Sequence, residues 1–224
     1  MKYETFINER ICECFEKLAS LGMNIVLISR THSKLQELAY EISNQMIYIS
    51  NALTHFFIRF FISLAFTERE HHTIQIRTIA TDFTEGDSIY PLLKFELVNL
   101  PSGVGMLINN VGMDATLGRF AELPADEEED IQKIINCNIM AMARLTNLIL
   151  PGMRSRQRGI VINVGSIWGT GTSCSTNEFA PCSIIYGATK VTYFTNSFGV
   201  PNNPFIITYA YFYSLSGFRG QIFA

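Results

Sequence analysis

The chain has 224 residues, of which 48% are hydrophobic and 17% are charged, and its formal net charge is −3. This composition predicts one globular α/β domain with a sizeable core and argues against a disordered chain. The slightly acidic balance provides no general attraction to nucleic acid, so we expect no nucleic-acid partner. The N-terminal residues are charged and lack an apolar core, so we expect no signal peptide there.

Cysteine and histidine spacing does not predict a metal site. The five cysteines are scattered, and the close pair Cys12 and Cys14 has no further ligand at metal-binding spacing. We therefore expect reduced thiols. His71 and His72 are adjacent and lack an acidic or cysteine partner at ligand spacing, which favours a solvated loop.

The first half of the chain predicts an alternation of helices and strands. Apolar runs bounded by glycine indicate buried strands, and apolar residues at helical spacing indicate helices. The expected elements are a helix over 15–21 stopped by Gly22, a strand over 23–29, a helix over 33–42, a strand over 73–80 and a helix over 86–97.

An aromatic-rich segment, residues 47–66, interrupts this alternation. Four polar residues recur in it at intervals of four, which makes one narrow polar stripe on a helix; they are Asn51, His55, Arg59 and Ser63. A central Arg costs about 2.5–3.5 kcal/mol on insertion scales, which argues against a simple membrane-spanning helix. Three alternatives stay open: a helix docked on the protein's own core, a helix lying in a membrane interface, and an unstructured insertion at about 46–70.

The second half continues the alternation. The acidic run 126–130 favours the positive end of a helix, so we interpret it as a helix start and not as a metal site. The expected elements are a strand over 105–109, a helix from 126 to about 150 stopped by Pro151, a strand over 159–164, a helix over 185–197 and a strand over 205–213. Strands alternating with helices predict a parallel sheet covered on both faces.

Tyr186 and Lys190 stand four residues apart on one of these helices, so they share a face. A tyrosine hydroxyl has a pKa near ~10 in water, and a lysine beside it favours the phenolate. The pair is therefore suited to exchanging a proton with a carbonyl or an alcohol. Many such pairs only cover surface, so the interpretation depends on the motifs that precede the pair.

Those motifs occur in a characteristic order, over roughly residues 15–45 and 73–197. They are FEKLASLGMNIVLISR, TDFTEGDSIY, LINNVGM, INCNIMAMARLTNLILPGM, GIVINVGS and YGATK. The series resembles the short-chain dehydrogenase/reductase family, in its branch of very-long-chain 3-oxoacyl-CoA reductases and 17β-hydroxysteroid dehydrogenases. The resemblance implies a Rossmann-like doubly wound sheet in one domain over 1–224, and reduction of a 3-oxoacyl-CoA or oxosteroid carbonyl by NADP(H).

The resemblance also implies roles for particular residues. Tyr186 would donate the proton, Lys190 would lower its pKa and hold the nicotinamide ribose, Ser166 would bind the substrate oxygen, and Asn138 would hold a proton relay. The implied cofactor-binding residues are Asn109, Asn110 and Gly112 at the floor of the site, Asp82 at the adenine edge, and Arg30.

Arg30 bears on the choice of cofactor. It follows the strand over 23–29, where family members that use NAD have an acid and those that use NADP have a basic group. NADP(H) is therefore the expected cofactor. The alternative is a solvated arginine at the end of a strand.

Some parts of the family pattern are not found in the sequence. The family's first strand and glycine-rich turn have no counterpart before Gly22, and the match fades after Ser197. We therefore expect a fold that lacks this strand and turn and is truncated at its C-terminus. Residues 165–171 have glycines spaced as in a phosphate-binding loop, so they are an alternative phosphate site. Against this alternative, the sequence has no acidic residue after Glu178 that could bind a ribose.

The identity of the serine is a second open point. Ser166 ends the expected strand, but Ser173 and Ser175 stand at the family's usual distance before the tyrosine. We prefer Ser166, with an insertion at about 167–180. The alternative function is a catalytically inactive or truncated relative that acts as a binding or membrane-peripheral protein through 47–66. The resemblance implies a lipid or steroid substrate and allows a homo-oligomer. It also implies a location at the endoplasmic reticulum membrane, or in the cytoplasm if the protein has no anchor.

Overall fold

The computed structural model describes residue 15 and residues 18–19, 21–44, 74–113, 128–166, 184–197 and 206–213. The chain divides into two compact units, of which one is Phe6–Asp82 and the other contains Phe83–Ala224. Residues 1–14, the polar stripe in 47–66 and both expected insertions lie outside the described residues. The expectation of one domain over the whole chain stays a prediction.

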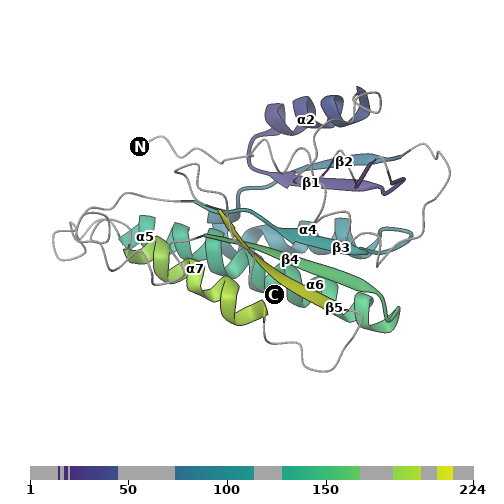
Figure 1. Ribbon diagram of the computed structural model, residues 1–224. Coiled ribbons are helices and arrows are strands. Elements are labelled where there is room, and N and C mark those ends of the chain that lie inside the picture. The colour runs from purple at the N-terminus through teal and green to yellow at the C-terminus, as the bar shows by residue number, and fades with distance from the viewer. Residues whose placement is uncertain are drawn as a thin grey trace. The chain divides into compact units, whose positions relative to one another are not determined.

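The described residues of Phe6–Asp82 include two parallel strands and a helix that covers them. Strand β1 (Ile25–Ser29) pairs in parallel with β2 (Ile76–Ala80). Helix α2 (His32–Asn44) packs against both strands (Figure 1). Its buried side is apolar and consists of Leu35, Leu38 and Ile42. The predicted order of strand, helix and strand is confirmed.

Gly22 ends the helix that precedes β1. Its φ is 75°, its N–H donates to the Ala19 carbonyl at 2.9 Å, and the Met23 N–H donates to the Leu18 carbonyl at 3.2 Å. These two bonds form a Schellman motif, in which glycine adopts the left-handed conformation without a steric penalty. The predicted helix stop is confirmed.

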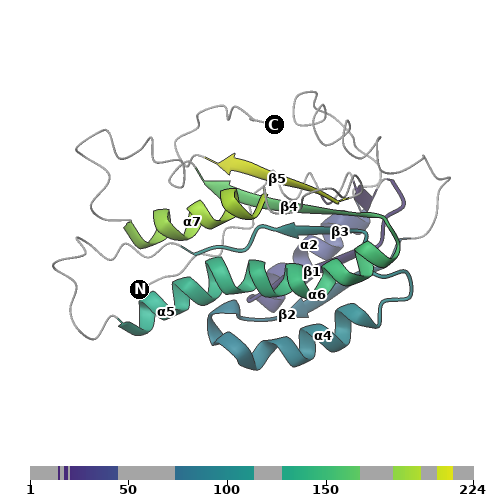
Figure 2. The same ribbon diagram turned by 90° about the horizontal axis from the view of Figure 1, so that it is seen from below.

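Three parallel strands form the sheet of the other unit, in the order β3–β4–β5. The strands are β3 (Met106–Asn109), β4 (Gly159–Ser166) and β5 (Ile206–Tyr213). Helix α7 (Ile184–Ser197) packs on β4 and β5, and Figure 2 shows it running beside the longer helix of this unit. Every described strand pairing is parallel, as predicted, and the α/β class is confirmed.

The longer helix has three parts. They are α5 (Glu128–Ile135), a π-helical turn η4 (Asn136–Met140) and α6 (Ala141–Ser155). The predicted stop at Pro151 is wrong, because α6 continues for a further turn. A proline removes one helical hydrogen bond, to the carbonyl four residues earlier, and the fully buried Met153 holds the last turn in the core.

The same helix tests the idea of a membrane span. Residues Glu129–Ser155 are long and apolar enough to cross a membrane by length and composition. However, α6 packs on β3 and β4, and η4 carries the fully buried Asn138. We therefore assign this helix to the core of its unit.

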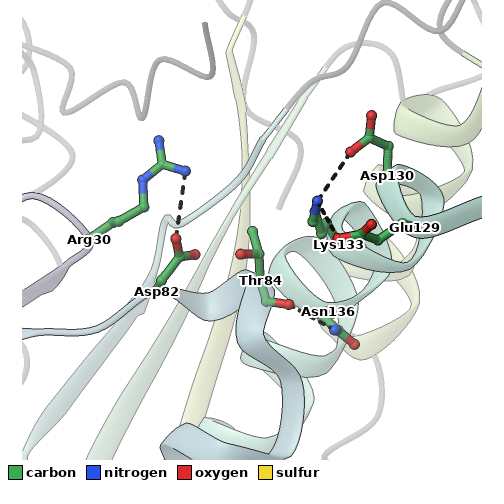
Figure 3. Close-up of polar contacts among 7 residues, drawn as sticks. All are labelled: Arg30, Asp82, Thr84, Glu129, Asp130, Lys133 and Asn136. Atoms are coloured by element: carbon green, nitrogen blue, oxygen red, sulfur yellow. Dashed lines mark hydrogen bonds and ion pairs between the residues drawn. The ribbon is translucent and has the colours of Figure 1, made fainter. Parts of the chain in front are cut away.

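The acidic run does begin a helix. Described helical residues start at Glu128, and Lys133 Nζ lies 2.8 Å from Glu129 Oε1 and 3.5 Å from Asp130 Oδ1 (Figure 3). The hydrogen bond to Glu129 raises the pKa of Lys133 above its usual value. The carboxylates thus support the first turns of α5, both through the helix dipole and through this lysine.

The helix predicted over 86–97 is divided into two elements. A 3-10 helix, η1 (Phe83–Ile89), contains Gly86 at φ 69° and ψ −129°, and α4 (Tyr90–Val98) follows it. The Asn136 side chain donates to the Thr84 carbonyl at 3.0 Å (Figure 3), and a Cβ on Gly86 would lie 3.2 Å from the same amide nitrogen. The helical backbone is therefore broken at a glycine that lets η1 lie close to η4.

Arg144 joins this region to α6. Its Nη2 lies 2.8 Å from Asp87 Oδ1, and its guanidinium carbon lies 4.7 Å from the centre of the Tyr90 ring. The Tyr90 hydroxyl is buried and has no hydrogen-bond partner in the described part of the chain. Burial raises the pKa of Tyr90 above its usual value, while the positive charge of Arg144 acts in the opposite direction.

We predict that Tyr90→Phe leaves the free energy of unfolding unchanged or raises it by about 1 kcal/mol, because a buried hydroxyl without a partner is destabilising. Because the pKa of Tyr90 is raised in the folded state, its contribution to the free energy of unfolding is fully present below about pH 10, the pKa of tyrosine in the unfolded chain. This contribution is lost as the pH rises through the pKa of Tyr90 in the folded state. The variant should lack this part of the alkaline loss. Urea unfolding of both proteins at neutral and alkaline pH measures the two effects. Clear destabilisation of the variant at neutral pH would contradict the assignment.

Candidate active site

Asn138 is the centre of a buried hydrogen-bond cluster. It lies in η4 and is 0% exposed, and its Oδ1 accepts the Met113 N–H at 2.8 Å. Its Nδ2 donates to the Met113 carbonyl at 2.9 Å and to Thr189 Oγ1 at 3.0 Å. Both amide protons are therefore used. This one side chain joins the π-helical turn to the segment that follows β3 and to α7.

Lys190 is buried beside Tyr186 on α7. The lysine is 4% exposed, and its Nζ lies 5.5 Å from the centre of the Tyr186 ring. The predicted shared face of these two residues is confirmed. A lysine is rarely buried to this extent without partners, and such groups gather at functional sites.

Gly112 provides the space for the lysine ammonium. A Cβ at this position would lie 2.8 Å from Lys190 Nζ and 3.5 Å from Asn138 Oδ1. The first distance is too short for an undisturbed contact, whereas the second is an ordinary one. A residue with a side chain at Gly112 would therefore displace the ammonium.

Asn109, at the carboxyl end of β3, and Asn163, within β4, form a second buried pair. They lie opposite each other in the parallel register. Asn109 Nδ2 donates to Asn163 Oδ1 at 2.9 Å and to Thr146 Oγ1 on α6 at 3.1 Å. These bonds fix the end of β3, from which the chain continues through Asn110 to Gly112.

Two of the predicted cofactor residues meet in the unit Phe6–Asp82. Arg30 Nη1 lies 3.7 Å from Asp82 Oδ2, and both side chains are partly exposed (Figure 3). The hydroxyls of Ser29 and Thr81 are buried and have no hydrogen-bond partner among the described residues. These hydroxyls stand at the carboxyl ends of adjacent parallel strands, where α/β sheets usually bind ligands.

Other predicted residues are only partly described. Ser166 ends β4 opposite Tyr213, but its side chain lies outside the described set. Asn110 is half-buried directly after β3. Ser173 and the greater part of the alternative phosphate cradle also fall outside the described ranges. The choice between Ser166 and Ser173 therefore stays a prediction.

The sequence interpretation missed several polar residues of these clusters. They are Ser29, Thr81, Thr146, Asn163 and Thr189. Asn163 could have been found, because it is an amide within an otherwise apolar strand, at a position like that of Asn109. The sequence indicates Thr189 less strongly, only through its position directly before Lys190.

A family model described as short chain dehydrogenase matches residues 63–203. The chain therefore belongs to the short-chain dehydrogenase family.

The chain is also similar to named relatives. The chain is 35% identical over 176 residues to a very-long-chain 3-oxoacyl-CoA reductase of Rattus norvegicus, covering 78% of this chain and 45% of the relative. It is 36% identical over 152 residues to human 17-beta-hydroxysteroid dehydrogenase type 3, covering 67% of this chain and 38% of the relative. The chain thus spans less than half the length of these two relatives.

A solved structure supports the fold. A short-chain dehydrogenase from Sphingobium yanoikuyae, in complex with NADPH, matches with a TM-score of 0.62 and 23% identity. The match covers 88% of this chain and 63% of that one. At this identity the likeness establishes the fold, which is the Rossmann-like fold expected from the sequence.

We predict that Gly112→Ala lowers the rate of the carbonyl reduction proposed below by on the order of tenfold to a hundredfold, because the new methyl group displaces the Lys190 ammonium. The midpoint of thermal unfolding should change little, since the other neighbour of the new methyl group is at ordinary contact distance. Steady-state kinetics and a thermal melt check both parts. Gly152→Ala in α6 is the matched control, because the three atoms nearest to its Cβ would belong to the Arg156 side chain, at 3.2 Å or more. Equal rates for Gly112→Ala and this control would contradict the prediction.

Proposed function

We propose that the protein reduces a carbonyl group, of 3-oxoacyl-CoA or oxosteroid type, with NADPH. The observation that carries this proposal is the buried Lys190 beside Tyr186, with its ammonium at Gly112. The family membership supports the reaction type, and the names of the relatives support the substrate class.

The proposed reaction needs a hydride and a proton. Bound NADPH would supply the hydride for the carbonyl carbon. The Tyr186 hydroxyl donates its proton to the carbonyl oxygen, which gives the alcohol. The positive charge of Lys190 stabilises the phenolate that Tyr186 becomes. Ser166, by resemblance, would hydrogen-bond the substrate oxygen.

The side-chain hydrogen bonds of Asn138 limit how it could hold the proton relay that the resemblance implies. The resemblance assigns it to a proton relay, but both of its side-chain protons are given to Met113 and Thr189. We propose that the Asn138 side chain holds the site together, and that any relay uses other groups than these N–H donors. Asn109 acts in the same way at the end of β3, through Asn163 and Thr146.

In each of the two compact units, taken by itself, described residues suit a part of NADP(H). Arg30 supplies a positive charge for a phosphate, and the unpartnered hydroxyls of Ser29 and Thr81 offer hydrogen bonds to a polar ligand. The Asp82 carboxylate lies near Arg30, so a bound phosphate would compete with this carboxylate for the guanidinium group. Lys190, whose ammonium lies at Gly112, would hold the ribose of the nicotinamide.

The direct test is NADPH oxidation by the full chain, with a long-chain 3-oxoacyl-CoA and with an oxosteroid. We predict turnover with NADPH in preference to NADH, and a loss of roughly 100- to 10,000-fold in kcat for Tyr186→Phe. Quenching of NADPH fluorescence should persist in this variant, because the hydroxyl acts in the chemical step. Tyr40→Phe, at an exposed position on α2, is the matched control and should keep wild-type activity.

Two results would count against the proposal. Protein that neither quenches NADPH fluorescence nor oxidises NADPH with either substrate would refute it. Cooperative unfolding together with this failure would favour the alternative, a non-catalytic relative that acts by binding. Contact of 47–66 with a membrane, location at the endoplasmic reticulum and homo-oligomer formation stay predictions.

A further inference from the structure

The Thr189 hydroxyl makes two hydrogen bonds in the interior of the unit. It donates to the Tyr186 carbonyl at 2.7 Å and accepts from Asn138 Nδ2 at 3.0 Å. The residue is 2% exposed. Thr189 therefore connects the helical turn that carries Tyr186 and Lys190 to the amide at the centre of the cluster.

The two bonds also fix the orientation of the Asn138 amide. Because the single hydroxyl proton points to the Tyr186 carbonyl, the oxygen presents only lone pairs to Asn138. Only the NH₂ end of the amide can bond to such an acceptor. The Met113 N–H requires the amide oxygen at the opposite end, at 2.8 Å.

This orientation matters for Lys190. A Cβ built on Gly112 would lie 3.5 Å from Asn138 Oδ1 and 2.8 Å from Lys190 Nζ, so the amide oxygen and the ammonium flank the same glycine. A rotated amide would turn its NH₂ group to this side, where the positive charge lies. The partial negative charge of the oxygen is the favourable neighbour.

We propose that Thr189 is a positioning residue of the active site. Its hydroxyl orients the Asn138 amide and fixes α7, so that Tyr186 and Lys190 are held in the geometry needed for proton transfer. It does not touch substrate or cofactor in this assignment. The proposal deepens the proposed function and rests on it for its effect on the rate, but the hydrogen-bond geometry can be tested without turnover.

The experiment compares wild type with Thr189→Val, which keeps the shape and removes the hydroxyl, and with Thr189→Ser, which keeps the hydroxyl. We expect Thr189→Val to lower kcat by on the order of tenfold to a hundredfold, with the Kd for NADPH within about twofold of wild type. Thr189→Ser should restore most of the rate. Thr78→Val in β2 is the matched control for the same chemical change and should keep the wild-type rate.

Nuclear magnetic resonance of the Asn138 side-chain amide provides a readout independent of activity. Its protons should exchange slowly in wild type and Thr189→Ser, and faster in Thr189→Val. Wild-type kcat in Thr189→Val, equal impairment of both variants, or a loss that lies in NADPH binding would overturn the positioning role.

An inactive wild-type protein would refute the proposed function alone. In that case the amide exchange decides the positioning role: slow exchange that depends on the hydroxyl supports it, and equal exchange in all three proteins overturns it.

Discussion

The packing of the unit that contains Phe83–Ala224 depends on one buried amide. Asn138 is fully enclosed, and its side chain bonds to both backbone groups of Met113 and to Thr189. Burying an amide is unfavourable unless its hydrogen bonds are made, so the cluster is stable only when η4, the end of β3 and α7 are all in place. The same requirement makes the cluster specific. An alternative packing of these elements would leave buried polar groups unpaired.

The cluster gives Lys190 its position. A buried ammonium needs partners and a defined space, and Gly112 supplies that space because it has no side chain. Tyr186 shares the helical face of Lys190, and the lysine Nζ lies 5.5 Å from the centre of the tyrosine ring. The proposed proton transfer requires such fixed geometry, and the Asn138 amide is bonded to Thr189 on the helix that carries Tyr186 and Lys190. Stability and the proposed chemistry therefore use the same side chains.

Sequence patterns predicted much of this architecture, but not its polar contacts. The apolar strands, the Gly22 stop and the shared face of Tyr186 and Lys190 follow from local periodicity. The π-helical turn at Asn136–Met140 does not, because an added residue in a long apolar helix barely changes its pattern. Contacts such as that between Asn109 and Asn163 join residues 54 positions apart, and only the strand register brings them together. Local sequence also predicts too early an end for α6, at Pro151. The packing of the buried Met153 outweighs the hydrogen bond that the proline removes.

Hydrogen exchange at the Met113 backbone amide tests the central role of Asn138 most directly. This N–H belongs to the segment after β3, outside any strand, so the Asn138 oxygen at 2.8 Å is the bond that protects it. The account predicts that it exchanges as slowly as the strand amides of β3 in wild type, and as fast as an unprotected loop amide in Asn138→Ala, while β4 amides remain protected. Fast exchange at Met113 in the wild-type protein, or equally slow exchange in the variant, would contradict the account.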